Sequence, residues 1–318
     1  MRADRAFRDL LLAALAVMAT LALPLVITLF PGALQRALHG YDALAEVCAL
    51  ALYRLGGELP HLGAVVLAIA SAVVLAGAAR AVRTISRTRA ALRSRRRLPL
   101  TRRLATAAAR VGVASRTVCF EDLRPIAYCA GVLRPMVWIS TGATERLEDD
   151  ELEAVLWHES YHLRHRDPWR ILIAQILREM LFLFPLVRSL VSRFEVAKEL
   201  DADREALRAQ GSAAPLAGAL TTLGRSAPPL VPADLAIGAW STSTARVDQL
   251  CGASEEFLLA PVSACARVGT GLAVAVLLLL AGGQAARANV VPAVVVQIVA
   301  PAATEIHECP LPIDGILF

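Results

Sequence analysis

Three of the six histidines in this 318-residue chain lie within eleven residues, in the stretch WHESYHLRHRD. His158 and His162 are four residues apart, so on a helix their side chains lie one turn apart on the same face. Glu159 completes an H-E-x-x-H motif, in which two imidazoles can share one zinc ion while the glutamate acts as a base. The alternative is a polar helix face with solvated histidines. As a zinc site, the motif requires a helix here and a further ligand from elsewhere in the chain.

The residues around the motif predict a helix that begins near Asp150 and ends near Asp167. Asp150 can cap it, with Glu153 as the capping-box partner, and apolar residues recur at helical spacing. Asp167-Pro168 ends this helix and can begin the next, because a residue before proline disfavours the helical conformation and proline fits a first helical position. His165 is expected to be solvated or to contact a ligand residue rather than to bind zinc.

A catalytic zinc ion usually takes three protein ligands, and residues 194–207 offer the third. Glu195, Glu199 and Asp203 follow at four-residue steps, on one face of a predicted helix. Glu199 is the predicted ligand, and Asp203 is expected to hydrogen-bond a ligand histidine and hold its ring. The alternative is an exposed acidic face with ion pairs such as Glu195–Lys198. H-E-x-x-H followed by E-x-x-x-D is typical of thermolysin-like zinc peptidases, the gluzincins.

The composition indicates a membrane protein. Hydrophobic residues make up 56% of the chain, and the mean hydropathy is +0.54. Residues 10–30, 62–79 and 268–286 carry no charge and are long enough to span a bilayer. The first segment is expected to be an uncleaved anchor, because its apolar stretch is too long for a signal peptide. Charges and a proline interrupt residues 171–191, which predict a helical hairpin instead of a span.

Arginine placement predicts the topology. Residues 80–103 contain ten arginines and no acidic residue, which is typical of a segment on the cytoplasmic side. The chain is therefore expected in the inner (plasma) membrane as a multi-pass protein, with the catalytic domain cytoplasmic and the C-terminus external. The predicted order is a cytoplasmic N-terminus (1–9), a transmembrane helix (10–30), an external loop (31–61), a transmembrane helix (62–79), a basic cytoplasmic linker (80–103), a cytoplasmic metallopeptidase domain (104–267), a transmembrane helix (268–286) and an external tail (287–318).

Two further segments have a predicted local structure. Arg134–Ser140 reads as a strand, bounded by Gly131 and by Thr141-Gly142. In zinc proteases of this type, the open edge of the strand before the motif helix can bind an extended peptide by strand addition, while core packing is the other use of such a strand. Residues 211–233, rich in Ala, Gly and Pro, predict a loop between helices.

The segments GVLRPMVWIS, HESYH, LRHRD and ELDAD together resemble the BlaR/MecR family of membrane metallopeptidases. The resemblance covers residues 115–255 and includes ARVDQL near Arg246. It implies a cytoplasmic gluzincin domain between membrane helices. Together with the three predicted spans, the expected fold is an α-helical membrane protein with three transmembrane helices and an α+β gluzincin-like zinc metalloprotease domain. The resemblance also implies regulatory proteolysis, in which the protein cuts itself or promotes cleavage of a winged-helix repressor. The implied site has Zn²⁺ ligands at His158, His162 and Glu199 and a general base at Glu159.

The sequence departs from the antibiotic sensors of this family. No S-x-x-K motif occurs, and only residues 287–318 follow the third predicted span, so sensing of beta-lactams is not expected. The family's additional N-terminal helix is also expected to be missing. The HtpX/CAAX proteases of protein quality control share H-E-x-x-H and the downstream glutamate and are the nearest alternative family. A non-catalytic membrane signalling adaptor is the alternative class, against which Glu159 argues, because zinc binding alone needs no base there.

The expected partners are membrane lipids and a protein substrate, with a winged-helix transcriptional repressor as the candidate. Direct binding of nucleic acid is not expected, since no helix-turn-helix or zinc-finger pattern accompanies the arginines. The sequence does not decide whether the protein forms a homodimer. The residue that stabilises the transition state also stays open among Tyr161, His165 and Arg246.

Overall fold

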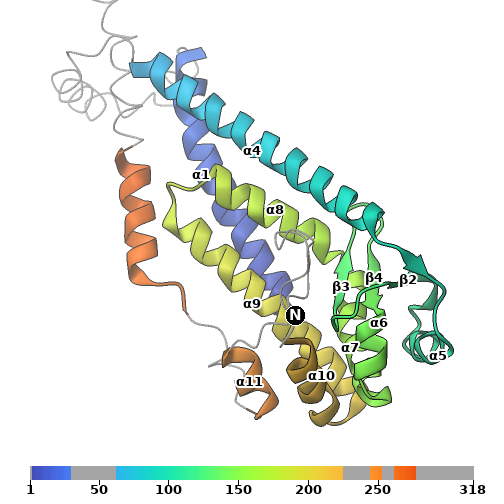
Figure 1. Ribbon diagram of the computed structural model, residues 1–318. Coiled ribbons are helices and arrows are strands. Elements are labelled where there is room, and N and C mark those ends of the chain that lie inside the picture. The colour runs from blue at the N-terminus through green and yellow to red at the C-terminus, as the bar shows by residue number, and fades with distance from the viewer. Residues whose placement is uncertain (1, 30–61, 225–243, 253–260, 277–318) are drawn as a thin grey trace, which may run out of the picture. The chain divides into compact units, whose positions relative to one another are not determined.

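The computed structural model describes residues 2–29, 62–224, 244–252 and 261–276, which are mostly helical with one small mixed sheet (Figure 1). The chain divides into two compact units. One contains residues 1–16 and 69–273, and the other contains residues 17–68 and 274–318. The first unit carries the sheet and every candidate site residue.

The sheet has four strands in the order β1-β2-β4-β3, with β4 parallel to β2 and antiparallel to β3. The predicted strand Arg134–Ser140 corresponds to β4, but the prediction that this strand offers an open edge is wrong, because β2 and β3 pair with its two sides. On that side of β4 the edge of the described sheet is β3, and all four residues of β3 are buried. The strands are β1 (Arg97–Leu98), β2 (Thr117–Phe120), β3 (Ala127–Ala130) and β4 (Met136–Ser140).

Helices make up most of the described residues. The short 3-10 helix Ala114–Arg116 leads into β2, and residues 264–276 are also helical. The α-helices are α1 (Arg2–Leu29), α4 (Leu62–Ser94), α5 (Arg102–Val111), α6 (Thr141–Arg146), α7 (Asp149–Arg164), α8 (Asp167–Met180), α9 (Pro185–Gln210), α10 (Ala214–Gly224) and α11 (Thr244–Leu250).

Helix α7 is the centre of the first unit, because it packs against α5, α9, α10 and the strands β3 and β4. Its apolar face, including Leu152, Val155 and Leu156, is fully buried in the main hydrophobic core. Its polar face is buried as well: His158 and His162 have no exposed surface. Histidines without exposed surface cannot form the solvated polar face that was the alternative reading of the motif.

The structure moves several predicted boundaries. The N-cap of α7 is Glu148, with Glu151 as the capping-box partner, and not Asp150 with Glu153. Helix α8 begins after Arg166, whose φ of 52° is left-handed and turns the chain sharply. Residues 171–191 are broken at 181–184 between α8 and α9, as a hairpin requires. The predicted loop at 211–233 is wrong for residues 214–224, which form α10.

Within the part of the chain that the structure describes, no helix combines the length and the apolar character that a bilayer span requires. The predicted spans 10–30 and 62–79 fall on α1 and α4, and α4 continues through Ser94, into the predicted basic linker. Of the third predicted span, residues 268–276 are described and are helical. Two predicted segments, the loop 31–61 and the tail 287–318, lie outside the described residues.

Candidate metal centre

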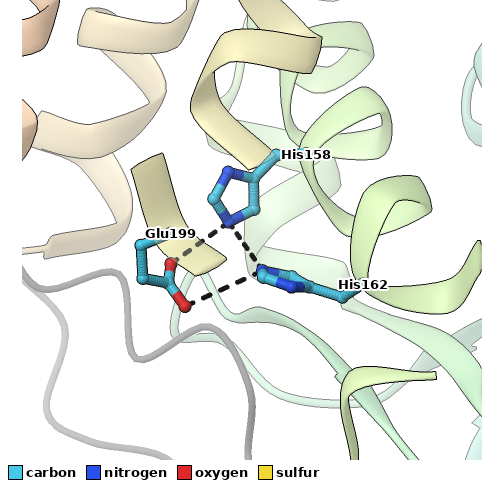
Figure 2. Close-up of side chains that lie close together, drawn as sticks. All are labelled: His158, His162 and Glu199. Carbon is cyan, nitrogen blue, oxygen red and sulfur yellow. Dashed lines mark hydrogen bonds and ion pairs between the residues drawn. The ribbon is translucent and has the colours of Figure 1, made fainter. Parts of the chain in front are cut away.

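Two helices bring three candidate ligands together (Figure 2). His158 and His162 project from one face of α7, and Glu199 projects from α9. The two Nε2 atoms are 3.2 Å apart; Glu199 Oε2 lies 3.4 Å from His158 Nε2, and Glu199 Oε1 lies 3.8 Å from His162 Nε2. All three ligand atoms lie within 4.8 Å of one another. Residues 37 or more positions apart in sequence thus meet at the spot that the two motifs predicted.

This group fits a zinc ion in both chemistry and size. Two imidazole nitrogens and one carboxylate oxygen are a common ligand set of catalytic zinc, which keeps a fourth position for water. Ligand atoms at the corners of a tetrahedron around zinc lie about 3.3 Å apart, given bond lengths of about 2.0–2.1 Å. The observed separations of 3.2, 3.4 and 3.8 Å match that spacing. The three residues can therefore hold one metal ion.

A buried carboxylate contacts Nδ1 of each histidine, the ring nitrogen that does not face the candidate metal site. His158 Nδ1 lies 2.9 Å from Asp203 Oδ1, and His162 Nδ1 lies 2.8 Å from Asp167 Oδ2. Both carboxylates have no exposed surface. A hydrogen bond from Nδ1 leaves Nε2 as the nitrogen that can bind a metal, and it fixes the direction of the ring. The role of Asp203 was predicted, whereas Asp167 was recognised only as a helix boundary.

Two buried cations accompany these carboxylates. Arg246 of α11 is 1% exposed and donates from Nε and Nη2 to the two oxygens of Asp203, each at 2.6 Å. Its Nη1 lies 3.7 Å from Glu199 Oε2. Lys198, the only lysine in the chain, donates to Glu199 Oε1 at 2.5 Å and so pairs with this residue instead of Glu195. The spacing of residues in the sequence did not point to Lys198. The one available signal was that the chain has no other lysine.

The positive charges of Lys198 and Arg246 keep the carboxylates of Glu199 and Asp203 ionised. Burial opposes ionisation of Glu199, but Lys198 and a hydrogen bond with His158 hold the pKa of Glu199 well below its usual range. Burial likewise opposes ionisation of Asp203, and Arg246 lowers its pKa.

The two histidines differ from each other. Burial lowers the pKa of His162, so this ring is neutral and ready to bind a metal. Burial also acts to lower the pKa of His158, but hydrogen bonds with Asp203 and Glu199 outweigh it and raise the pKa to about 9. A metal ion at His158 must therefore displace a proton, as is general for protein ligands.

Glu159 is fully buried on α7, next to the first ligand histidine. After burial, its charge is the largest cause of the raised pKa of Cys129 on β3. Its charge also contributes to the raised pKa of Arg246, after the opposing effect of burial and the larger contributions of Asp203 and Glu199. Glu159 thus carries a buried carboxylate next to a candidate ligand, on the helix that packs against β3, where a general base is needed if a peptide binds near that strand.

The three candidates for transition-state stabilisation have defined contacts. Tyr161 is fully buried, and its hydroxyl donates to Asp201 Oδ2 at 3.4 Å. His165 stacks on the Tyr161 ring at 4.0 Å, and its Nδ1 lies 2.9 Å from the Tyr161 carbonyl oxygen. Arg246 contacts Asp203 and, through Nη1, approaches Glu199. Tyr161 contacts a candidate ligand through its ring, which lies edge-on to the His162 ring at 5.8 Å, and Arg246 contacts one through its charge.

The purified chain is expected to hold one zinc ion, and His162→Ala and Glu199→Ala are each expected to lose most of it. Removal of one of three ligands leaves too few protein bonds to the metal. Metal analysis of the three proteins after dialysis provides the measurement. His165→Ala is the matched control, since this histidine lies one turn from the centre and should leave the zinc content unchanged. Equal zinc in wild type and both ligand variants would contradict the site.

Comparison with known proteins supports the same conclusion. The family model described as BlaR1 peptidase M56 matches residues 50–214, which is more than half of the chain. The match includes the H-E-x-x-H motif, Glu199 and Asp203, while Arg246 lies beyond it. No curated protein matches the chain. The chain belongs to the BlaR1 peptidase M56 family, a family of metallopeptidases, as the resemblance of its motifs predicted.

Proposed function

We propose that this protein is a membrane-anchored zinc endopeptidase that acts in regulatory proteolysis. The observation that carries the proposal is the meeting of His158, His162 and Glu199 beside the buried carboxylate of Glu159. Membership in the M56 family supports metallopeptidase chemistry. The proposed substrates are the chain itself and a winged-helix transcriptional repressor.

The reaction is hydrolysis of a peptide bond. Bound zinc supplies Lewis acidity, which makes a water molecule more acidic and polarises the scissile carbonyl. Glu159 accepts one proton from the attacking water while the water oxygen bonds to the carbonyl carbon. Glu159 then passes that proton to the amide nitrogen, and the carbon–nitrogen bond breaks to give a carboxylic acid and an amine; the second proton of the water then passes from the acid to the amine. Asp203 and Asp167 keep the two histidine rings fixed during these steps.

The second candidate is a membrane adaptor that keeps the zinc fold without catalysis. Zinc binding needs three ligands and their supporting carboxylates, but it does not need a glutamate at position 159. A buried carboxylate is costly to maintain, and general-base catalysis gives this one a use. Glu159 therefore favours the enzyme over the adaptor.

We further propose that the chain crosses the membrane at residues 10–30, 62–79 and 268–286, with residues 80–267 in the cytoplasm. The ten arginines after the second segment support this orientation. Reporter fusions after residue 90 and after residue 300 are expected to report opposite sides of the membrane. The same side for both fusions would mean an even number of crossings between them and would contradict the proposed topology.

The Glu159→Gln substitution is expected to keep zinc and abolish proteolysis. Glutamine has nearly the same shape but cannot accept the proton, and loss of a general base typically lowers a rate by about 100- to 10,000-fold. Cleavage of the chain itself and of a co-expressed winged-helix repressor would be followed in membranes, beside the zinc content of each protein. Glu153→Gln, on the exposed side of the same helix, is the matched control and should cleave normally.

The possible results separate the two candidates. Undiminished cleavage by Glu159→Gln would remove this residue from the mechanism. Loss of zinc in the same variant would instead assign it a structural role at the centre. A zinc-loaded wild type that cleaves neither target would favour the adaptor.

A further inference from the structure

The first turn of α1 packs against the helices that carry the candidate ligands. Ala3 is fully buried, and its backbone N–H donates to Asp201 Oδ2 of α9 at 2.9 Å. Its carbonyl oxygen accepts from Arg170 Nη2 of α8 at 3.4 Å. Figure 1 shows this end of α1, marked N, beside α9. Residues 1–9, predicted as a cytoplasmic N-terminus, thus lie in the same compact unit as the candidate ligands.

Arg170 is held mainly by α1. It is 9% exposed, and its Nη2 lies 3.0 Å from Asp4 Oδ1. The guanidinium lies over the ring of Phe7 from α1, at 4.7 Å, and over the ring of Phe194 from α9, at 5.3 Å. Cation–π contacts with two rings whose centroids lie 5.1 Å apart, and a charged hydrogen bond at the tip, leave the side chain little freedom.

The other end of the Arg170 guanidinium reaches the support of a candidate ligand. Its Nη1 donates to Asp167 Oδ1 at 3.4 Å, while Asp167 Oδ2 lies 2.8 Å from His162 Nδ1. Asp167 therefore divides its two oxygens between Arg170 and His162. Since Asp167 is fully buried, loss of its cation would leave a buried charge without compensation and a carboxylate free to rotate. A continuous chain of contacts results: Asp4, Arg170, Asp167, His162.

A second route runs from the same turn to α7. Asp201 Oδ2 accepts from both the Ala3 N–H and the Tyr161 hydroxyl. Tyr161 directly precedes His162 on α7, and Asp201 follows Glu199 by two residues on α9. The first turn of α1 is thus joined, through Asp201, to the residue that precedes His162 on α7.

We propose that the first turn of α1 positions the metal centre. Arg170 is the positioning residue: the first turn of α1 fixes Arg170, and Arg170 acts on His162 through Asp167. The inference rests on the proposed function, because it assumes that His158, His162 and Glu199 bind zinc. Asp4 and Ala3 fix Arg170; Arg170 fixes Asp167. A movement of the first turn of α1 would therefore change the metal centre without touching a ligand.

Zinc affinity, measured on the full chain in detergent by competition with a chromophoric chelator, tests this inference. Arg170→Met is expected to weaken zinc binding by about three- to tenfold, at or below the low end for residues that support a ligand directly. Asp4→Asn should weaken it in the same direction but less. Arg170→Lys should restore part of the affinity, because it keeps the charge but not the two-sided hydrogen bonding.

Two matched controls isolate the path. Arg178→Met removes a partly exposed arginine from the same helix, and Asp9→Asn removes a partly exposed acid from the same end of α1. Neither should change zinc affinity. The double variant Asp4→Asn/Arg170→Met should bind zinc no more weakly than Arg170→Met alone, since both changes interrupt one path. Fully additive losses would overturn the path, even if each single change weakens binding.

A spectroscopic reading separates positioning from general destabilisation. The visible absorption of the cobalt(II)-substituted chain should shift in Arg170→Met and stay unchanged in Arg178→Met. If Arg170→Met does not fold, Asp4→Asn decides alone, because its side chain is half-exposed and the change is small. Unchanged zinc affinity and cobalt spectrum in folded variants would overturn the inference and leave the proposed function intact. A wild type that binds no zinc would overturn the proposed function and this inference with it.

Discussion

Two hydrogen bonds, from buried imidazoles to buried carboxylates, are the constraint on which the rest of this unit depends. Asp203 and Asp167 turn the Nε2 atoms of His158 and His162 toward each other and toward Glu199. Carboxylates at such depth need cations, and these come from other parts of the chain: Arg246 on α11 for Asp203, and Arg170 on α8 for Asp167. The requirement to compensate buried charge therefore helps to fix α7, α8, α9 and α11 around one point.

This account also explains why the centre extends beyond its ligands. Glu199 is paired with Lys198, the only lysine in a chain that otherwise uses arginine for its positive charges. A compact ammonium can donate to one oxygen of Glu199 without forming the two-point pair that arginine favours. The other oxygen then stays directed at His158, 3.4 Å away. Arg170, which lies over the adjacent rings of Phe7 and Phe194, extends the same support to the first turn of α1.

The sequence predicted the ligands better than their surroundings, for physical reasons. Helical spacing places His158 and His162 on one face of their helix, and Glu199 and Asp203 on one face of another. This spacing can be read from the local sequence alone. Strand β4 was located within two residues, but its pairing on both sides depends on contacts that no local pattern encodes. The role of Asp167 depends on the left-handed turn at Arg166, and that of Arg170 on a residue 167 positions away. Helix α10 was missed because Ala, Gly and Pro suggest a loop, whereas its apolar face is buried in the main core.

X-ray absorption at the zinc edge of the zinc-loaded chain tests the central claim most directly, because it identifies the atoms bonded to the metal. The account predicts a shell of nitrogen and oxygen neighbours only, at about 2.0–2.1 Å, with the multiple-scattering signal of two imidazoles. In His162→Ala, any zinc that remains should show one imidazole. Sulfur neighbours at about 2.3 Å, or a zinc shell without imidazole scattering, would contradict the account.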